Sequence, residues 1–222
     1  MEGKTELIVE IPVGRATLEG NLVIPDGAEG LVIFAHGSGS SRHSPRNRSV
    51  AAELQKRGLA TLLMDLLTPE EESVDRRSGQ YRFDIDLLGD RVLGTIDRIV
   101  REEETGQLNI GVFGSSTGAA AALTAAAKRP KNIKAVVSRG GRTDMAASVL
   151  PKVMAPVLFI AGERDTTILR INRESMKHIN AEKNLEIIPG ATHLFEEPGA
   201  LEKVAVLARA WFKRFLTNLV IP

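Results

Sequence analysis

The chain has 222 residues, with 29 basic and 28 acidic side chains, a net charge of +1 and no cysteine. The lack of cysteine excludes disulfides, thiolate metal sites and a cysteine nucleophile. Charges of both signs are mixed without long runs of one sign, which argues against nucleic acid or a membrane as a partner. The residues after Met1 lack the basic start and apolar core of a secretory signal, so we expect a cytoplasmic protein.

The length is ordinary for one α/β domain. No repeat, low-complexity tract or linker rich in Pro, Gly and Ser divides the chain. We therefore predict a single domain over residues 1–222.

Short apolar runs alternate with segments long enough for helices. The first two runs, residues 7–11 and 17–24, predict an antiparallel pair of strands at a sheet edge. The later runs are continuously apolar, which is typical of parallel strands buried on both faces. These later runs are residues 31–35, 60–64, 110–113, 135–137, 157–161 and 185–188. The pattern predicts an α/β fold with an eight-stranded, mostly parallel sheet and helices on both faces.

Two segments between and after these runs have apolar residues at helical spacing, which predicts core-facing stripes. The stripes are Ile85, Leu88, Val92, Ile96 and Ile99, and Leu201, Val204, Ala208, Trp211, Phe215 and Leu219. The charged segment 69–82 is expected to form a loop or flap over the functional site.

Gly114-Ser115-Ser116-Thr117-Gly118 stands between an apolar run and an alanine-rich segment. A strand-to-helix turn of the pattern Gly-x-Ser-x-Gly exposes its serine at the sheet edge, where ligands of parallel sheets bind. The same stretch lies in the longest uncharged run, residues 105–127, but its glycines and serines favour a strand–turn–helix unit over a membrane span. A plain helix cap is the alternative. We predict Ser116 as a nucleophile.

A serine needs a positioned base to remove its proton. His193 lies between the last apolar run and the C-terminal helical segment, and it is our candidate. The alternatives fit less well: His36 lies in a glycine-rich turn, His43 in a basic loop, and His178 in a helical segment.

Asp165 follows the apolar run that precedes the histidine's own, and we predict it as the acid that orients His193. Glu163 and Asp144 are its rivals. The order serine, acid, histidine is the order of the α/β-hydrolases.

An oxyanion hole needs two convergent N–H donors. The backbone N–H of Thr117 directly follows the nucleophile, and Gly37-Ser38-Gly39 after the third run lets backbone approach a substrate. We predict the N–H groups of Ser38 and Thr117 as the two donors.

Four arginines follow strands on the predicted site edge: Arg42 and Arg46 after the third, and Arg139 and Arg142 after the sixth. Arginine binds carboxylate or phosphate through two hydrogen bonds, and it also forms ion pairs within a protein. We expect ion pairs for Arg42 and Arg46. Arg139 is a candidate substrate-binding residue, with an ion pair as the equal alternative.

These motifs resemble the dienelactone hydrolase-like branch of the α/β-hydrolases over essentially the whole chain. The marks are residues 34–42, 65–68, 114–118, 137–142 and 193–199. The resemblance implies Ser116, Asp165 and His193 as a triad, with no metal or organic cofactor. True dienelactone hydrolase has a cysteine at the position of Ser116, so the branch name does not carry its substrate over.

The sequence therefore predicts a serine hydrolase that cleaves small-molecule carboxylic esters or lactones through an acyl-enzyme on Ser116. A thioesterase or other acyl-transfer enzyme with the same chemistry is one alternative. A non-catalytic partner module that kept the fold is the other.

Overall fold

All eight apolar runs form strands of one sheet in the computed structural model, which describes residues 5–217. The strands are β1 (Glu6–Val13), β2 (Ala16–Val23), β3 (Gly30–Ala35), β4 (Ala60–Met64), β5 (Asn109–Ser115), β6 (Ile133–Arg139), β7 (Val157–Gly162) and β8 (Lys183–Ile188). Their order in the sheet is β1-β2-β4-β3-β5-β6-β7-β8. β2 is antiparallel to both β1 and β4, and the other neighbours are parallel. The predicted mostly parallel, eight-stranded sheet is confirmed.

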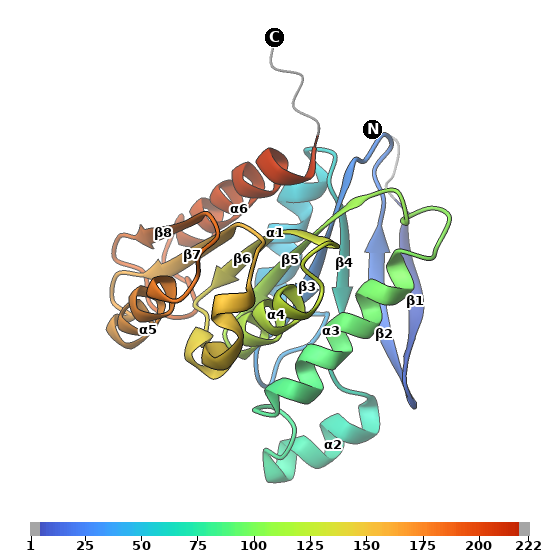
Figure 1. The fold of residues 1–222 in the computed structure, drawn as a ribbon, viewed down its shortest axis with the longest axis horizontal. Coiled ribbons are helices and arrows are strands. Elements are labelled where there is room, and N and C mark those ends of the chain that lie inside the picture. Colours follow the sequence, from blue (N-terminus) through green and yellow to red (C-terminus); the bar gives the residue numbers. More distant parts are fainter. Residues whose placement is uncertain (1–4, 218–222) are drawn as a thin grey trace.

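Helices cover both faces of this sheet (Figure 1). They are α1 (Pro45–Gln55), α2 (Pro69–Ser78), α3 (Ile85–Ile99), α4 (Thr117–Lys128), the 3₁₀ helix η1 (Thr143–Lys152), α5 (Thr166–Lys177) and α6 (Ala200–Leu216). α1 and α6 pack together on one face, and α3 packs against α4 on the other. Side chains of the central strands alternate between these layers: Ile33 and Val112 join the core under α3 and α4, whereas Phe34 and Phe113 join the core under α1 and α6. Two buried apolar layers of this kind hold the strand ends in fixed positions.

The predicted helical stripes lie against the sheet. Leu88, Val92, Ile96 and Ile99 of α3 are buried, and so are Val204, Ala208 and Trp211 of α6. Leu219, the last residue of the predicted C-terminal stripe, lies outside the described residues.

Segment 69–82, expected to be a loop or flap over the site, is helical in its first part and borders a cavity beside Ser38 and Thr117. Its first ten residues form α2, because Pro69 is the first helical residue and Thr68 and Glu71 make a reciprocal capping box. An ion pair between Glu72 and Arg76 adds an i,i+4 contact on the exposed face. The charges of this segment therefore support a short surface helix, which stands beside the sheet below α3 in Figure 1.

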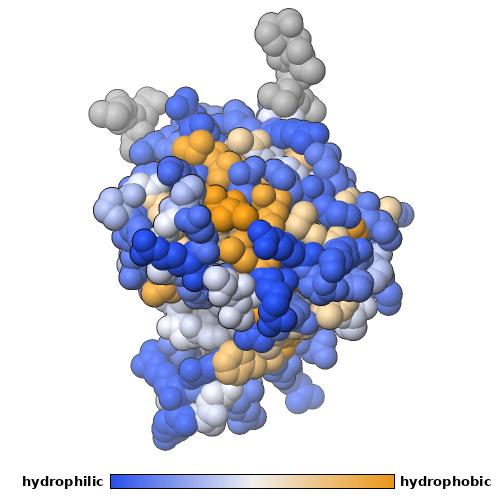
Figure 2. Space-filling model, turned by 90° about the vertical axis from the view of Figure 1, so that its left-hand side faces the viewer, coloured by the Kyte–Doolittle hydropathy of each residue, from blue (hydrophilic) through white to orange (hydrophobic). Residues whose placement is uncertain are grey.

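The outer edge at β8 carries several exposed apolar side chains. Figure 2 shows this side of the molecule, with apolar residues gathered near its middle and hydrophilic ones around them. Ile187 and Val206, which help to line a shallow groove there, keep 37% and 45% of their surface exposed. In the described part of the chain, every helix is too short or too polar to cross a membrane.

Candidate active site

Ser116 lies on a sharp turn between β5 and α4, with φ 51° and ψ −118°. This backbone conformation is strained for a residue with a side chain, and it is the conformation that a nucleophile elbow imposes. A Cβ on Gly118 would lie 2.2 Å from the Ala35 oxygen, and one on Gly114 would lie 2.4 Å from the Ala119 Cα. The two motif glycines are therefore required for α4 to pack closely against β3 and β5.

His193 and Asp165 are in direct contact at the same sheet edge. Nδ1 of His193 lies 2.6 Å from Oδ2 of Asp165, which follows β7. The other oxygen of Asp165 accepts the Ile168 N–H at 3.3 Å and caps α5. The carboxylate is thus held by the helix, and it fixes the proton of the histidine ring on Nδ1.

Gly140 lies against the His193 ring, near its Cε1 and Nδ1 atoms. Its φ is 57°, and a Cβ there would lie 3.3 Å from Cε1 of His193. The Ser116 N–H donates to the Arg139 oxygen at 3.1 Å, so the elbow and the histidine ring flank the same short segment. Sequence reasoning missed this role of Gly140, although a glycine pair directly after a strand was the available signal.

No hydrogen bond joins the Ser116 hydroxyl to His193 among those of residues 5–217. The contact that we expected between nucleophile and base is therefore not formed here, whereas the contact between base and acid is. Hydrogen bonds of this kind are often long without substrate and shorten when it binds.

The two rival acids are engaged elsewhere. Glu163 accepts the Gly190 N–H at 2.7 Å, and Asp144 forms a two-point ion pair with Arg142. Neither carboxylate contacts His193, so the geometry favours Asp165.

His36 is a buried support of the glycine-rich turn. Its Nε2 accepts the Leu66 N–H at 3.1 Å, which leaves the ring proton on Nδ1, 2.9 Å from the Gly37 oxygen. Burial lowers the pKa of His36, so the ring is neutral. His43 and His178 are exposed, and His178 ends α5 rather than lying inside it.

Ser38 and Thr117, the two predicted oxyanion-hole residues, come together from β3 and β5. Their hydroxyl oxygens lie 3.0 Å apart. In the hydrogen bonds of the described residues, neither backbone N–H donates to a protein acceptor. Both donors are therefore available to a ligand beside Ser116.

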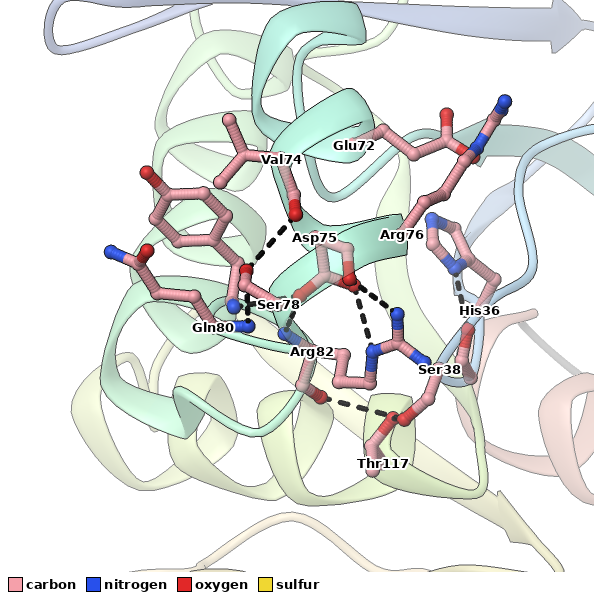
Figure 3. Close-up of polar contacts among 12 residues, drawn as sticks. His36, Ser38, Glu72, Val74, Asp75, Arg76, Ser78, Gln80, Arg82 and Thr117 are labelled. Carbon is pink, nitrogen blue, oxygen red and sulfur yellow. Dashed lines mark hydrogen bonds and ion pairs between the residues drawn. The ribbon is translucent and has the colours of Figure 1, made fainter.

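A further contact ties this pair to the loop after α2 (Figure 3). The Ser38 hydroxyl lies 3.5 Å from the Arg82 oxygen. Asp75, 3% exposed, accepts the N–H groups of Tyr81 and Arg82 and the Nε–H of Arg82 at 2.7 to 2.9 Å. Burial alone would raise the pKa of Asp75, but these hydrogen bonds outweigh it and lower the pKa.

The loop after α2, which these hydrogen bonds to Asp75 hold in place, borders a cavity of about 80 Å³. The cavity lies next to Ser38 and Thr117. Its lining includes Ser38 and Thr117, the apolar side chains of Leu66, Leu67 and Leu88, and Arg82. The sequence contained no pattern that would have indicated this cavity, because its walls come from segments that are far apart in the chain.

The four arginines differ in their partners. Arg42 pairs with Asp65 and Glu19, Arg46 with Glu196, and Arg142 with Asp144. Arg139 is only 8% exposed and forms no ion pair with any described residue. Burial lowers its pKa to about 10, and the charge of Arg46 contributes to the decrease. At neutral pH the Arg139 guanidinium therefore still carries its charge.

Within residues 5–217, no three His, Asp or Glu side chains are grouped in a way that could hold a metal ion. What the edge does hold is a strained serine, a histidine with its acid, and two free N–H donors. This set can perform nucleophilic acyl transfer.

Comparisons with known proteins agree with this architecture. A model of the dienelactone hydrolase family matches residues 18–218. A candidate phosphoribosyl transferase of Mycobacterium tuberculosis is 50% identical over 204 residues, which are 92% of this chain but 45% of that protein. The chain thus spans about half the length of the curated relatives it matches.

Two solved structures have a similar fold. A dienelactone hydrolase from Anabaena variabilis has a TM-score of 0.95 and 54% identity, over 96% of this chain and 99% of that one. Est1E from Butyrivibrio proteoclasticus has a TM-score of 0.77 at 18% identity, over 93% and 98% of the two chains, which shows the shared α/β-hydrolase fold. The chain belongs to the dienelactone hydrolase family.

Proposed function

We propose that this protein is a serine hydrolase that cleaves small carboxylic esters or lactones through an acyl-enzyme on Ser116. The observation that carries the proposal is the 2.6 Å contact between Asp165 and His193 beside a serine held at φ 51°. A strained serine that only capped a helix would not need an oriented histidine next to it.

The reaction begins when Nε2 of His193 takes the proton of the Ser116 hydroxyl and the oxygen attacks the ester carbonyl carbon. The carbonyl oxygen becomes an oxyanion, which the N–H groups of Thr117 and Ser38 stabilise. When the tetrahedral intermediate collapses, the bond to the alcohol breaks and His193 returns the proton to the leaving oxygen. A water molecule then gives a proton to His193 and attacks the acyl-enzyme carbonyl. The bond to Ser116 breaks, Ser116 regains its proton from His193, and the carboxylic acid is released.

Asp165 stabilises the charged ring during both steps, because its carboxylate already accepts the Nδ1–H. The hydrogen bond between the Ser38 and Thr117 hydroxyls holds the two backbone N–H groups in position relative to each other.

The cavity beside the two donors supports a small substrate. It measures about 80 Å³, with an apolar wall of leucines and a polar rim at Arg82. A short acyl chain can enter such a space, whereas a long one has to remain outside. The name of the Anabaena relative agrees with a lactone or ester as substrate. The name of the mycobacterial relative describes a protein about twice as long.

Covalent labelling tests the proposal directly. A fluorophosphonate probe should attach to Ser116, with the modified peptide identified by mass spectrometry, and Ser116→Ala should remain unlabelled. A panel of short p-nitrophenyl esters and lactones, with thioesters of matched acyl length, should then show turnover that favours the oxygen esters. Labelling at another serine, or no labelling of folded protein, would contradict the proposal. Faster turnover of the thioesters would assign the same triad to a thioesterase.

A further inference from the structure

Arg139 presents a buried positive charge that the described residues leave unsatisfied. Its Nε donates to the Ser115 hydroxyl at 3.3 Å, and its guanidinium carbon lies 5.7 Å from the centre of the Phe195 ring. Its Nη1 is buried and has no hydrogen-bond partner. Burial of a charge without a counter-ion is expensive, because lost hydration is not replaced. The other three arginines of this edge avoid that expense through ion pairs.

Arg46 brings a second positive charge to the same place. It lies in the first turn of α1, and its Nε is also buried without a partner. Its Nη1 reaches Glu196 at 3.2 Å, but that carboxylate is 65% exposed, so the pair is weakly held. Glu196, which solvent screens, is thus the carboxylate partner of Arg46 alone and does not pair with Arg139.

The start of α1 adds to this positive field. No acidic residue occupies its first turn, the positive end of the helix dipole. Pro45 has no N–H and the Asn47 N–H donates to the Ser44 hydroxyl, so the Arg46 N–H is the first-turn donor left for a ligand. Asn47 of that turn accepts the Ser115 O–H at 3.0 Å, and the same Ser115 oxygen accepts the Nε–H of Arg139. This chain of hydrogen bonds connects the guanidinium to the helix start.

Among the described residues, the carboxylates of Asp165 and Glu197 form no ion pair with Arg139 or Arg46, although Oε2 of Glu197 is buried without a partner. Asp165 bonds to His193, and Glu197 accepts the Thr192 N–H at 3.0 Å. Within the described residues, Arg139 therefore has no carboxylate partner, and Arg46 has only the exposed Glu196.

We propose that Arg139, Arg46 and the first turn of α1 form a binding subsite for an oxyanion, either a carboxylate or a phosphate group. Arginine suits both, because its planar donors match two oxygens at once. The subsite is close to the nucleophile in the fold, since the Arg139 backbone oxygen accepts the Ser116 N–H and the Arg139 side chain contacts Ser115, the residue before it. Its assignment to an anionic group of the ester substrate, rather than to free phosphate, rests on the proposed function.

Equilibrium binding tests the subsite without any need for turnover. Inorganic phosphate should bind the whole protein in calorimetry at constant ionic strength, and it should raise the melting temperature. Arg139→Met should weaken phosphate binding by about tenfold or more, the effect of one lost charge-assisted hydrogen bond. Arg142→Met is the matched control, because Arg142 is three residues away and already paired with Asp144, and it should bind phosphate like the parent.

Kinetics with two esters of equal length then identify the source of the oxyanion. If the anion belongs to the substrate, an ester with a terminal carboxylate should exceed its neutral counterpart in kcat/KM, and Arg139→Met should remove that preference. If the parent binds phosphate but shows no preference between the esters, the subsite holds a free oxyanion. The absence of all activity would refute the proposed function and leave the calorimetric result to decide the subsite.

The subsite proposal is overturned if phosphate does not bind the parent, or if Arg139→Met binds it equally well. Should Arg139→Met fail to fold, Arg46→Met replaces it, because Arg46 is about one third exposed and its substitution disturbs less of the core. Arg46→Met should show the same direction of effect.

Discussion

Asp165 bonds to His193 at 2.6 Å through one oxygen, while its other oxygen caps α5 at the Ile168 N–H. The two residues are 28 positions apart in the chain, yet the helix start holds the carboxylate where the ring needs it. One side chain therefore orients the base and stabilises a helix, and the two roles can be separated by substitution.

Asp165→Asn should separate them. Asparagine caps helices about as well as aspartate, so the free energy of unfolding should change little. Its NH₂ group, however, would favour the wrong histidine tautomer, and kcat should fall by about 10⁴-fold, as in a serine protease with the corresponding change. Steady-state kinetics and urea unfolding measure the two effects. Glu163→Gln, which alters the rival acid, should keep parental kcat; a similar loss there would mean that Glu163 shares the role.

The strain at Ser116 predicts a difference between two inactive variants. Ser116→Ala keeps a Cβ at φ 51°, whereas Ser116→Gly removes it. Relief of the strain, less the extra entropy of unfolded glycine, should make the glycine variant more stable by about 1 kcal/mol. Chemical denaturation of both proteins gives the difference. An alanine variant that is equally or more stable would show that the elbow stores no strain.

Gly37→Ala should disturb the nucleophile directly. The added Cβ would lie 3.0 Å from Cβ of Ser116 and 3.1 Å from the Ser115 oxygen. A small displacement of the reacting groups should lower kcat by about 10-fold to 100-fold. Gly27→Ala is the control, because Gly27 has a φ of 66° and no neighbour within 4 Å, so it should lose some stability and no activity. Unchanged kcat in Gly37→Ala would mean that the turn yields without moving the serine.

His36 should make stability depend on pH. Burial lowers the pKa of His36 below its ordinary value of 6.5, despite the opposing charges of Asp65 and Glu72. The unfolded chain therefore binds a proton more readily, so stability is full above 6.5 and is lost as the pH falls from there toward the lowered pKa. Urea unfolding from about pH 7 to about pH 5 should show this loss, since an unfolded histidine titrates near 6.5.

The variant His36→Gln tests the assignment. It should be less stable than the parent at neutral pH, because the hydrogen bond to Leu66 changes, but its stability should depend less on pH over the same range. An equally steep profile in the variant would place the titrating group elsewhere.

Local patterns in the sequence determined the strands, the two apolar helix faces and the elbow at Ser116. Each of these features depends on residues that are close together in the sequence. A strand follows from a continuous apolar run, a helix face from apolar residues spaced three and four apart, and the elbow from glycines on both sides of a serine. Ser116, Asp165 and His193 could also be predicted as a triad, because each follows an apolar run and they occur in the order serine, acid, histidine. The helix within segment 69–82 was not predicted, although the capping box at Thr68 and Glu71 was a local signal for it.

Only the tertiary structure decided which groups meet. Glu163 and Asp165 are two residues apart and follow the same strand, but the start of α5 turns Asp165 toward His193 while Glu163 bonds to Gly190. Arg139 ends β6 and Arg142 follows three residues later, yet Arg142 pairs with Asp144 whereas Arg139 is buried without an acidic partner among the described residues. Such choices depend on side-chain direction and on partners from distant strands, whose positions come from the packing of both layers and not from any local pattern.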